Sequence, residues 1–182
     1  MEIIDIYPPY IYSIHYDDEE ECEYDRLFQL WNDVGYVVNF MTENKTYLQS
    51  PIWKKIIEPE DAARQVLAEA TDLEDYFETL EKNVNQGTLP DFDSYFKILN
   101  GRKYEFELER LPMKSYGLER PSLLRLYAIK LQSNLYIITG GGIKLADSIQ
   151  NSPGLKDHVL QNIDRVREFL KSNCIMDADD LN

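Results

Sequence analysis

Four side chains suited to phosphate chemistry lie between residues 122 and 144 of a strongly acidic chain: Arg125, Tyr127, Lys130 and Lys144. An arginine guanidinium meets two phosphate oxygens at once and keeps its proton at physiological pH. A tyrosine ring can stack on an unpaired base, and lysines add positive charge. These residue types indicate chemistry on a nucleic-acid backbone, with Arg125 as the first candidate for binding a phosphate.

The residues that position these side chains form two β-patterned runs joined by the polar segment 132–134, which predicts a β-hairpin. In the first run, Leu124, Leu126 and Ala128 alternate with Arg125 and Tyr127. Successive side chains of a strand point to opposite faces. We therefore expect Arg125 and Tyr127 to share one exposed sheet face, with Lys144 at its edge.

A further strand is predicted over residues 103–109, where apolar and charged residues alternate. Cleavage of RNA without a metal requires a base for the 2′-hydroxyl, positive charge near the phosphorane and an acid for the leaving oxygen. Glu107 or Glu105 is the candidate base, Arg125 is the candidate for stabilising charge on the phosphorane, and Lys144 or Lys130 adds positive charge. Arg102 and Lys103, at the start of this strand, are candidate RNA contacts together with Tyr127 and Lys130.

Charge is unevenly distributed along the 182 residues, whose net charge is −14. Residues 1–96 carry a net charge of −16, residues 97–145 carry +5 and residues 146–182 carry −3. Phosphate binding needs Lys and Arg, so only the middle segment suits a polyanion. The acidic run 17–21 is interpreted as a solvated start of a helix rather than a cation site.

The remaining elements follow from the spacing of apolar residues and from capping signals. One helix is predicted over residues 24–41, a second from Pro59 to just before Asn85, and a third from Ser152-Pro153 to Leu170. Short extended pieces precede them over residues 3–16. The order predicts a single α+β domain over residues 1–176 with a short acidic tail at 177–182.

Motifs for other chemistry are missing from the sequence. Cys22 and Cys174 lie in no metal-ligand pattern, and His15 and His158 have no partner spacing for a metal or a catalytic triad. We expect two free thiols, no metal site and no cofactor. No membrane-length apolar run or secretory signal is visible, so we expect a cytoplasmic protein.

Residues 122–144 resemble the RelE/HigB family of bacterial toxins, the toxin components of type II toxin–antitoxin systems. The resemblance rests on Arg125-Leu126-Tyr127, which matches the Arg-x-Tyr context of the family's paired strands, and on a glycine-containing turn before a basic residue, matched by 140–144. The order of the predicted helices and strands also resembles that of the family, over nearly the whole chain.

The resemblance implies two N-terminal helices packed on one face of a small twisted antiparallel sheet, a C-terminal helix, and an opposite face that holds mRNA for cleavage on the ribosome. It implies an endoribonuclease, an mRNA interferase that needs no metal, and a cognate helix-turn-helix antitoxin as partner. Each residue role has an alternative. Arg125 can pair with Glu105 or Glu107 across the sheet, Tyr127 can serve in packing, and Gly140 to Gly142 can form a bulge or strand end.

The chain departs from this family in its length and acidity, because such toxins are usually small and basic. A second function therefore stays open, that of a non-catalytic interaction domain on the same scaffold. Its acidic helices and tyrosine-rich surface would bind another protein, such as a basic DNA-binding regulator.

Overall fold

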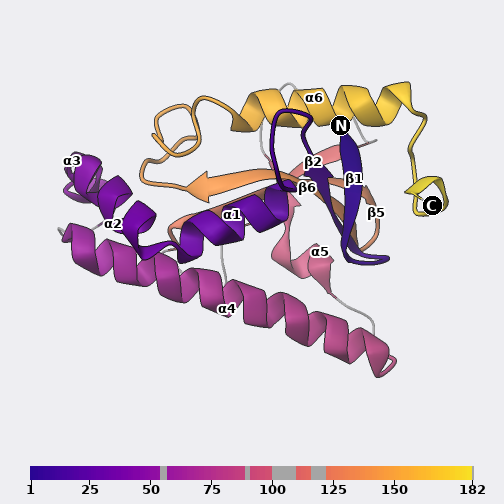
Figure 1. Cartoon of the computed structure of the whole chain (residues 1–182), viewed down its shortest axis with the longest axis horizontal. Coiled ribbons are helices and arrows are strands. Elements are labelled where there is room, and N and C mark those ends of the chain that lie inside the picture. Colours follow the sequence, from indigo (N-terminus) through magenta and orange to yellow (C-terminus); the bar gives the residue numbers. More distant parts are fainter. Residues whose placement is uncertain (54–56, 89–90, 100–109, 116–121, 182) are drawn as a thin grey trace.

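A computed structural model describes residues 1–53, 57–88, 91–99, 110–115 and 122–181. The chain has an α+β fold, and its described residues form a six-stranded sheet with helices on both faces (Figure 1). In the described part of the chain, no helix is long and apolar enough to cross a membrane.

The sheet is mixed, with the strand order β1-β2-β6-β5-β4-β3. Strand β2 runs parallel to β6, and the other neighbouring strands are antiparallel. The prediction of an antiparallel sheet is therefore wrong for one pair of strands, β2 and β6. After β2 the chain passes through a long helical segment before it returns to the sheet at β3, and such a long connection permits a parallel neighbour. The strands are β1 (Glu2–Tyr7), β2 (Ile11–His15), β3 (Lys97–Ile98), β4 (Leu111–Lys114), β5 (Leu124–Gln132) and β6 (Leu135–Ile143).

The predicted hairpin is confirmed in β5 and β6, which are joined by Ser133 and Asn134. Asn134 has a φ of 59°, a left-handed conformation that asparagine tolerates and that a tight hairpin turn favours. The register shifts at Thr139, because Tyr127 pairs with Gly140 while Ala128 pairs with Ile138. This bulge lies next to the glycine run, so Gly140 to Gly142 form part of β6 and not the turn expected from the family resemblance.

The single helix predicted over residues 24–41 is wrong, because two helices occupy this region. Helix α1 (Glu23–Asn32) ends before Asp33, and α2 (Val34–Glu43) begins after it. The Asp33 carboxylate accepts the backbone N–H of Tyr36 at 2.9 Å, the contact of a helix N-cap. An N-cap residue has extended rather than helical dihedrals, so Asp33 divides the apolar pattern into two helices.

The second predicted helix is confirmed as α4 (Pro59–Asn85), with proline in its first turn. The short helices α3 (Lys45–Leu48), η1 (Pro51–Trp53) and α5 (Phe92–Tyr95) lie before and after it. Helices α1 and α4 lie on one side of the sheet (Figure 1). Trp31, Val66 and Phe77 from these helices are at most 1% exposed and share a core with β5 and β6. Each such side chain contributes roughly 1.5–3 kcal/mol on burial.

Helix α6 (Val159–Ser172) covers the opposite face of the sheet (Figure 1). Its Val159 and Ile163 pack with Leu155 against Tyr127. The prediction that this face of the sheet is exposed at Tyr127 is therefore wrong. The helix also starts later than predicted. The Ser152 hydroxyl accepts the backbone N–H of Leu145 at 2.8 Å instead of capping a helix. The acidic tail ends in a short 3-10 helix, η2 (Asp179–Leu181).

Two glycines of β6 let neighbouring groups approach the strand closely. A Cβ on Gly141 would lie 2.7 Å from the Arg125 carbonyl oxygen and 2.8 Å from Leu27 of α1. A Cβ on Gly142 would lie 2.5 Å from the carbonyl oxygen of Gly154, in the loop before α6. Such distances are below van der Waals contact, so side chains at these positions would force the layers apart.

We predict that Gly142→Ala lowers the free energy of unfolding by about 1–3 kcal/mol, because the added methyl group meets backbone that cannot move aside cheaply. Gly140→Ala is the matched control in the same strand, since its nearest contact would be an ordinary 3.6 Å to Glu23. Urea unfolding of the two variants and the wild type measures the difference. Equal stabilities for the two variants would contradict the close packing of β6 against the loop.

Candidate functional site

The start of β5 is held by a carboxylate from helix α4. Glu69 accepts the backbone N–H groups of Leu123 and Leu124 at 2.8 and 2.9 Å and the hydroxyl of Ser122 at 2.8 Å. Hydrogen bonds to an ionised acceptor are about twice as strong as neutral ones. They fix the backbone directly before Arg125. Helix α4 therefore positions the residue that the sequence indicates as the first candidate for binding a phosphate.

Three cations on neighbouring strands converge at this end of the sheet: Arg125 on β5, Lys144 just after β6, and Lys114 at the end of β4. Arg125 lies opposite Gly142, and Lys144 follows two residues later, with its N–H donating to the Leu123 carbonyl at 2.7 Å. Lys114 lies opposite Tyr127, two residues from Arg125 and thus on the same sheet face. We call Lys114, Arg125 and Lys144 the basic cluster.

The electrostatics of Lys144 reflect this convergence. Partial burial lowers the pKa of its ammonium group, and the positive charges of Arg125 and Lys114 lower it further. The Lys144 Nζ donates to the Asp147 carbonyl oxygen at 2.8 Å, and Arg125 Nη1 donates to the Ser122 carbonyl oxygen at 3.0 Å. Arginine and lysine are the residue types that bind phosphate and carboxylate groups, so the basic cluster has suitable chemistry for such a ligand.

Sequence reasoning missed Lys114. It lies on β4, a four-residue strand that contains Pro112 and pairs with β5. A proline within a short run argues against a strand, because it cannot donate to the ladder. Only the distribution of charge, which marked residues 97–145 as basic, pointed toward this region.

The predicted exposure of Tyr127 is wrong. Its side chain is 1% exposed and lies beneath Leu155, Val159 and Ile163. The alternation that placed Tyr127 opposite Leu126 is correct, since Leu126 lies in the core with α1 and α4. The error arose because α6 supplies a second apolar layer on that face. A ring in this position packs in a core and does not present a face to a nucleotide.

Lys130 lies near the other end of the hairpin, five residues along β5 from Arg125, which corresponds to roughly 16 Å of extended strand. Its Nζ forms an ion pair with Asp93 of α5 at 2.9 Å. The same carboxylate accepts the Tyr136 hydroxyl at 2.5 Å and the Asn134 backbone N–H at 3.0 Å. Lys130 thus ties α5 to the hairpin turn and does not join the basic cluster.

The other candidates, Glu105, Glu107, Arg102 and Lys103, lie outside the described residues. The position of the candidate base is therefore not described. The alternative pairing of Arg125 with Glu105 or Glu107 stays a prediction. In the described part of the chain, no three His, Cys, Asp or Glu side chains are grouped as a metal-ion site.

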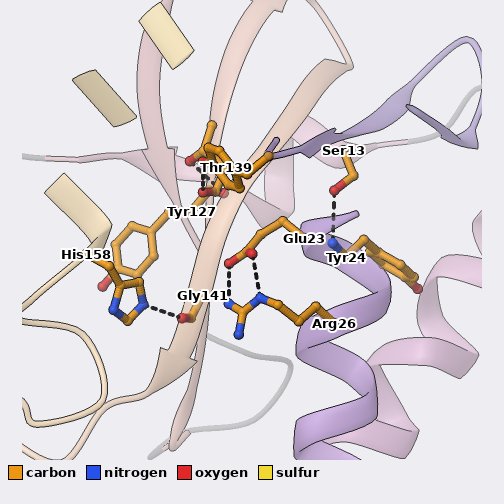
Figure 2. A network of polar contacts seen from close by, with 9 residues as sticks. Ser13, Glu23, Tyr24, Arg26, Tyr127, Thr139, Gly141 and His158 are labelled. Atoms are coloured by element: carbon orange, nitrogen blue, oxygen red, sulfur yellow. Dashed lines mark hydrogen bonds and ion pairs between the residues drawn. The ribbon is translucent and has the colours of Figure 1, made fainter. Parts of the chain in front are cut away.

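A buried polar network next to the glycine run was not predicted from the sequence (Figure 2). Glu23, 2% exposed in the first turn of α1, accepts two hydrogen bonds from Arg26 at 2.8 and 2.7 Å. Burial raises the pKa of the Glu23 carboxyl, and the contact with Arg26 opposes this rise. The His158 Nε2 lies 3.4 Å from the Gly141 carbonyl oxygen. The only sequence signal was the i, i+3 spacing of Glu23 and Arg26.

Comparison of the chain with protein-family models, curated proteins and solved structures gives no match.

The Asp93 contacts predict a pH dependence of stability. Burial, the largest single influence, raises the pKa of this carboxyl, but the hydrogen bonds that it accepts outweigh burial and lower the pKa from 3.8 to about 2. A depressed pKa stabilises the fold above the unfolded value, and this contribution is lost as the pH falls from about 4 through 2.

We therefore expect Asp93→Asn to be less stable than the wild type by about 1 kcal/mol near neutral pH, with the difference shrinking between about pH 4 and pH 2. Asp157→Asn, at an exposed position, serves as control. Urea unfolding across this pH range measures both. If the wild type stayed more stable than Asp93→Asn by the same free energy of unfolding down to about pH 2, the ionised Asp93 carboxylate would not be the source of the difference.

Proposed function

We propose that this protein is a RelE/HigB-like toxin that cleaves mRNA on the ribosome, and that the basic cluster binds the scissile phosphate. The observation that carries the proposal is the convergence of Lys114, Arg125 and Lys144 at one end of the sheet, in a chain whose net charge is −14. Three cations gathered at one place give this acidic chain a local positive potential, which attracts an anion.

The roles within the cluster follow from the chemistry of phosphodiester cleavage. Attack by the 2′-hydroxyl places an additional negative charge on the phosphorane oxygens. The planar guanidinium of Arg125 can bind two of these oxygens, and the ammonium groups of Lys144 and Lys114 add charge beside it. The candidate base that takes the 2′-hydroxyl proton remains Glu107, with Glu105 as the alternative.

The position of α6 restricts how RNA would approach. Because α6 covers Tyr127, the substrate cannot lie across the whole sheet face as the family resemblance implies. The three cations of the basic cluster, at the end of the sheet, are partly exposed. We therefore place the RNA backbone over the ends of β4 and β5 and the residues after β6, with Lys130 outside the contact.

The proposed partner is a helix-turn-helix antitoxin that neutralises the toxin by covering the basic cluster. The second candidate function, a non-catalytic protein-binding domain, is favoured by the acidic helical half of the chain, where residues 1–96 carry a net charge of −16. Acidic surfaces select basic protein partners and repel RNA. The two functions differ in their effect on growing cells.

Induced expression in bacteria tests the proposal. We expect wild-type protein to arrest growth, while Arg125→Ala and Lys144→Ala relieve the arrest, because each removes a charge that stabilises the transition state by several kcal/mol in comparable sites. Lys82→Ala, an exposed lysine of α4, is the control and should remain toxic.

Circular dichroism and soluble yield establish that the variants fold. Normal growth with well-expressed wild-type protein would refute the toxin proposal, and so would an arrest that persists unchanged in both folded cluster variants.

A further inference from the structure

Strand β1 forms one edge of the sheet, next to β2 (Figure 1). Its six residues are all exposed or half-buried, whereas β2 is almost wholly buried. The strand at the other edge, β3, is two residues long. A very short strand is one of the ways in which proteins protect a sheet edge from pairing with another chain. The edge at β1 lacks this protection.

The pairing of β2 with β6 shows which backbone groups of β2 face β1. The Tyr136 N–H of β6 donates to the carbonyl oxygen of Tyr10, the residue before β2, at 2.8 Å. The backbone groups of a strand point alternately to its two sides, so those of Tyr12 also face β6. Those of Ser13 therefore face β1.

The same alternation identifies the outward groups of β1. Ser13 lies opposite Ile4 in an antiparallel pairing, so the N–H and C=O groups of Ile4 face β2. The N–H and C=O groups of Ile3 and Asp5 consequently point away from the sheet. Among the described residues, no side chain or backbone group forms a hydrogen bond with them. They form a row of donors and acceptors suited to another strand.

The side chains of β1 are only partly covered on both faces of the sheet. Ile3 packs with the apolar cluster on the α6 side, and Ile4 and Ile6 pack with the cluster beneath α1 and α4. All three are half-buried. A strand added at this edge would cover apolar surface on both faces at once, in addition to satisfying the outward backbone groups.

A second copy of this chain fits the edge through a two-fold axis at Ile4. In this antiparallel register Ile3 lies opposite Asp5 of the other copy, so the two outward residues exchange both of their backbone hydrogen bonds. Glu2 lies opposite Ile6 of the other copy. Each exposed carboxylate of β1 therefore faces an isoleucine and not another carboxylate, which avoids the repulsion of like charges directly opposite each other.

The neighbouring registers that join outward residues are less suitable. An axis at Asp5 places the two Asp5 carboxylates opposite each other. An axis at Ile3 brings Asp5 opposite Met1, whose ammonium group already forms an ion pair with Asp17. The register centred on Ile4 has neither conflict.

We propose that this protein self-associates through the β1 edges of two copies, which joins their sheets across a two-fold axis at Ile4. A bulge between Asp5 and Tyr7 confines the pairing to the first residues of the strand, so the association is weak and reversible. Each copy has a net charge of −14, so the copies repel and added salt strengthens the dimer. The inference does not depend on the proposed nuclease activity.

Light scattering on the full chain, at concentrations up to ~0.5 mM, tests the association. We expect the wild type to approach twice the mass of one chain, at lower concentrations in high salt. Asp5→Pro removes an outward N–H from each copy and should raise the dissociation constant about 10- to 100-fold. Asp5→Ala removes the same carboxylate but keeps the N–H, so this matched control should associate at least as well as the wild type.

Disulfide formation tests the register in a chain that carries Cys174→Ser, which removes the exposed native thiol. Two Ile4 positions on the axis would have Cα atoms about 4.5 Å apart, within reach of a disulfide. Ile4→Cys should therefore cross-link rapidly on mild oxidation. Glu2→Cys is the control, because two Glu2 positions would lie roughly 13 Å apart along the strands.

Circular dichroism establishes that each variant is folded. A wild type that stays monomeric over the whole range of concentration and salt would overturn the proposal. So would a folded Asp5→Pro variant that associates as the wild type does, which would place the contact on another surface. Equal cross-linking of Ile4→Cys and Glu2→Cys would also overturn it.

Discussion

The contact between Glu69 and the start of β5 joins the helical layer to the sheet at the point where the candidate site is built. One carboxylate on α4 satisfies two backbone N–H groups and a hydroxyl, which would otherwise lack partners at the end of a buried strand. Arg125 follows directly, and its strand partner Gly142 is held by the loop at Gly154. The basic cluster therefore rests on contacts from both layers.

The placement of α6 changes what that cluster can do. A sheet with helices on one face alone would offer a broad surface to RNA, with Tyr127 available for stacking. With α6 in place, Tyr127 becomes part of a core, while the three cations at the end of the sheet stay partly exposed. The acidic side chains are concentrated elsewhere in the chain, since residues 1–96 carry a net charge of −16. This separation of charge is how a basic cluster can exist at a net charge of −14.

Local signals in the sequence were sufficient for part of this structure. The hairpin and α4 were predicted because alternation, turn residues and proline at a helix start depend on neighbouring residues. The parallel pairing of β2 with β6 and the packing of α6 over Tyr127 join segments far apart in the chain, which no periodicity reveals. The break at Asp33 was missed because the apolar spacing continues across it. At the site, Arg125 and Lys144 were found from their residue types, whereas Lys114 required the register of β4.

The proposed toxin activity requires that the basic cluster acts on RNA that is being translated. The most direct measurement is the integrity of a reporter mRNA in a bacterial cell-free translation extract, mapped by primer extension after addition of purified protein. We expect discrete cuts with the wild-type protein, present only while ribosomes translate and lost in Arg125→Ala. An mRNA that remains intact with folded wild-type protein, or is cut equally by the variant, would contradict it.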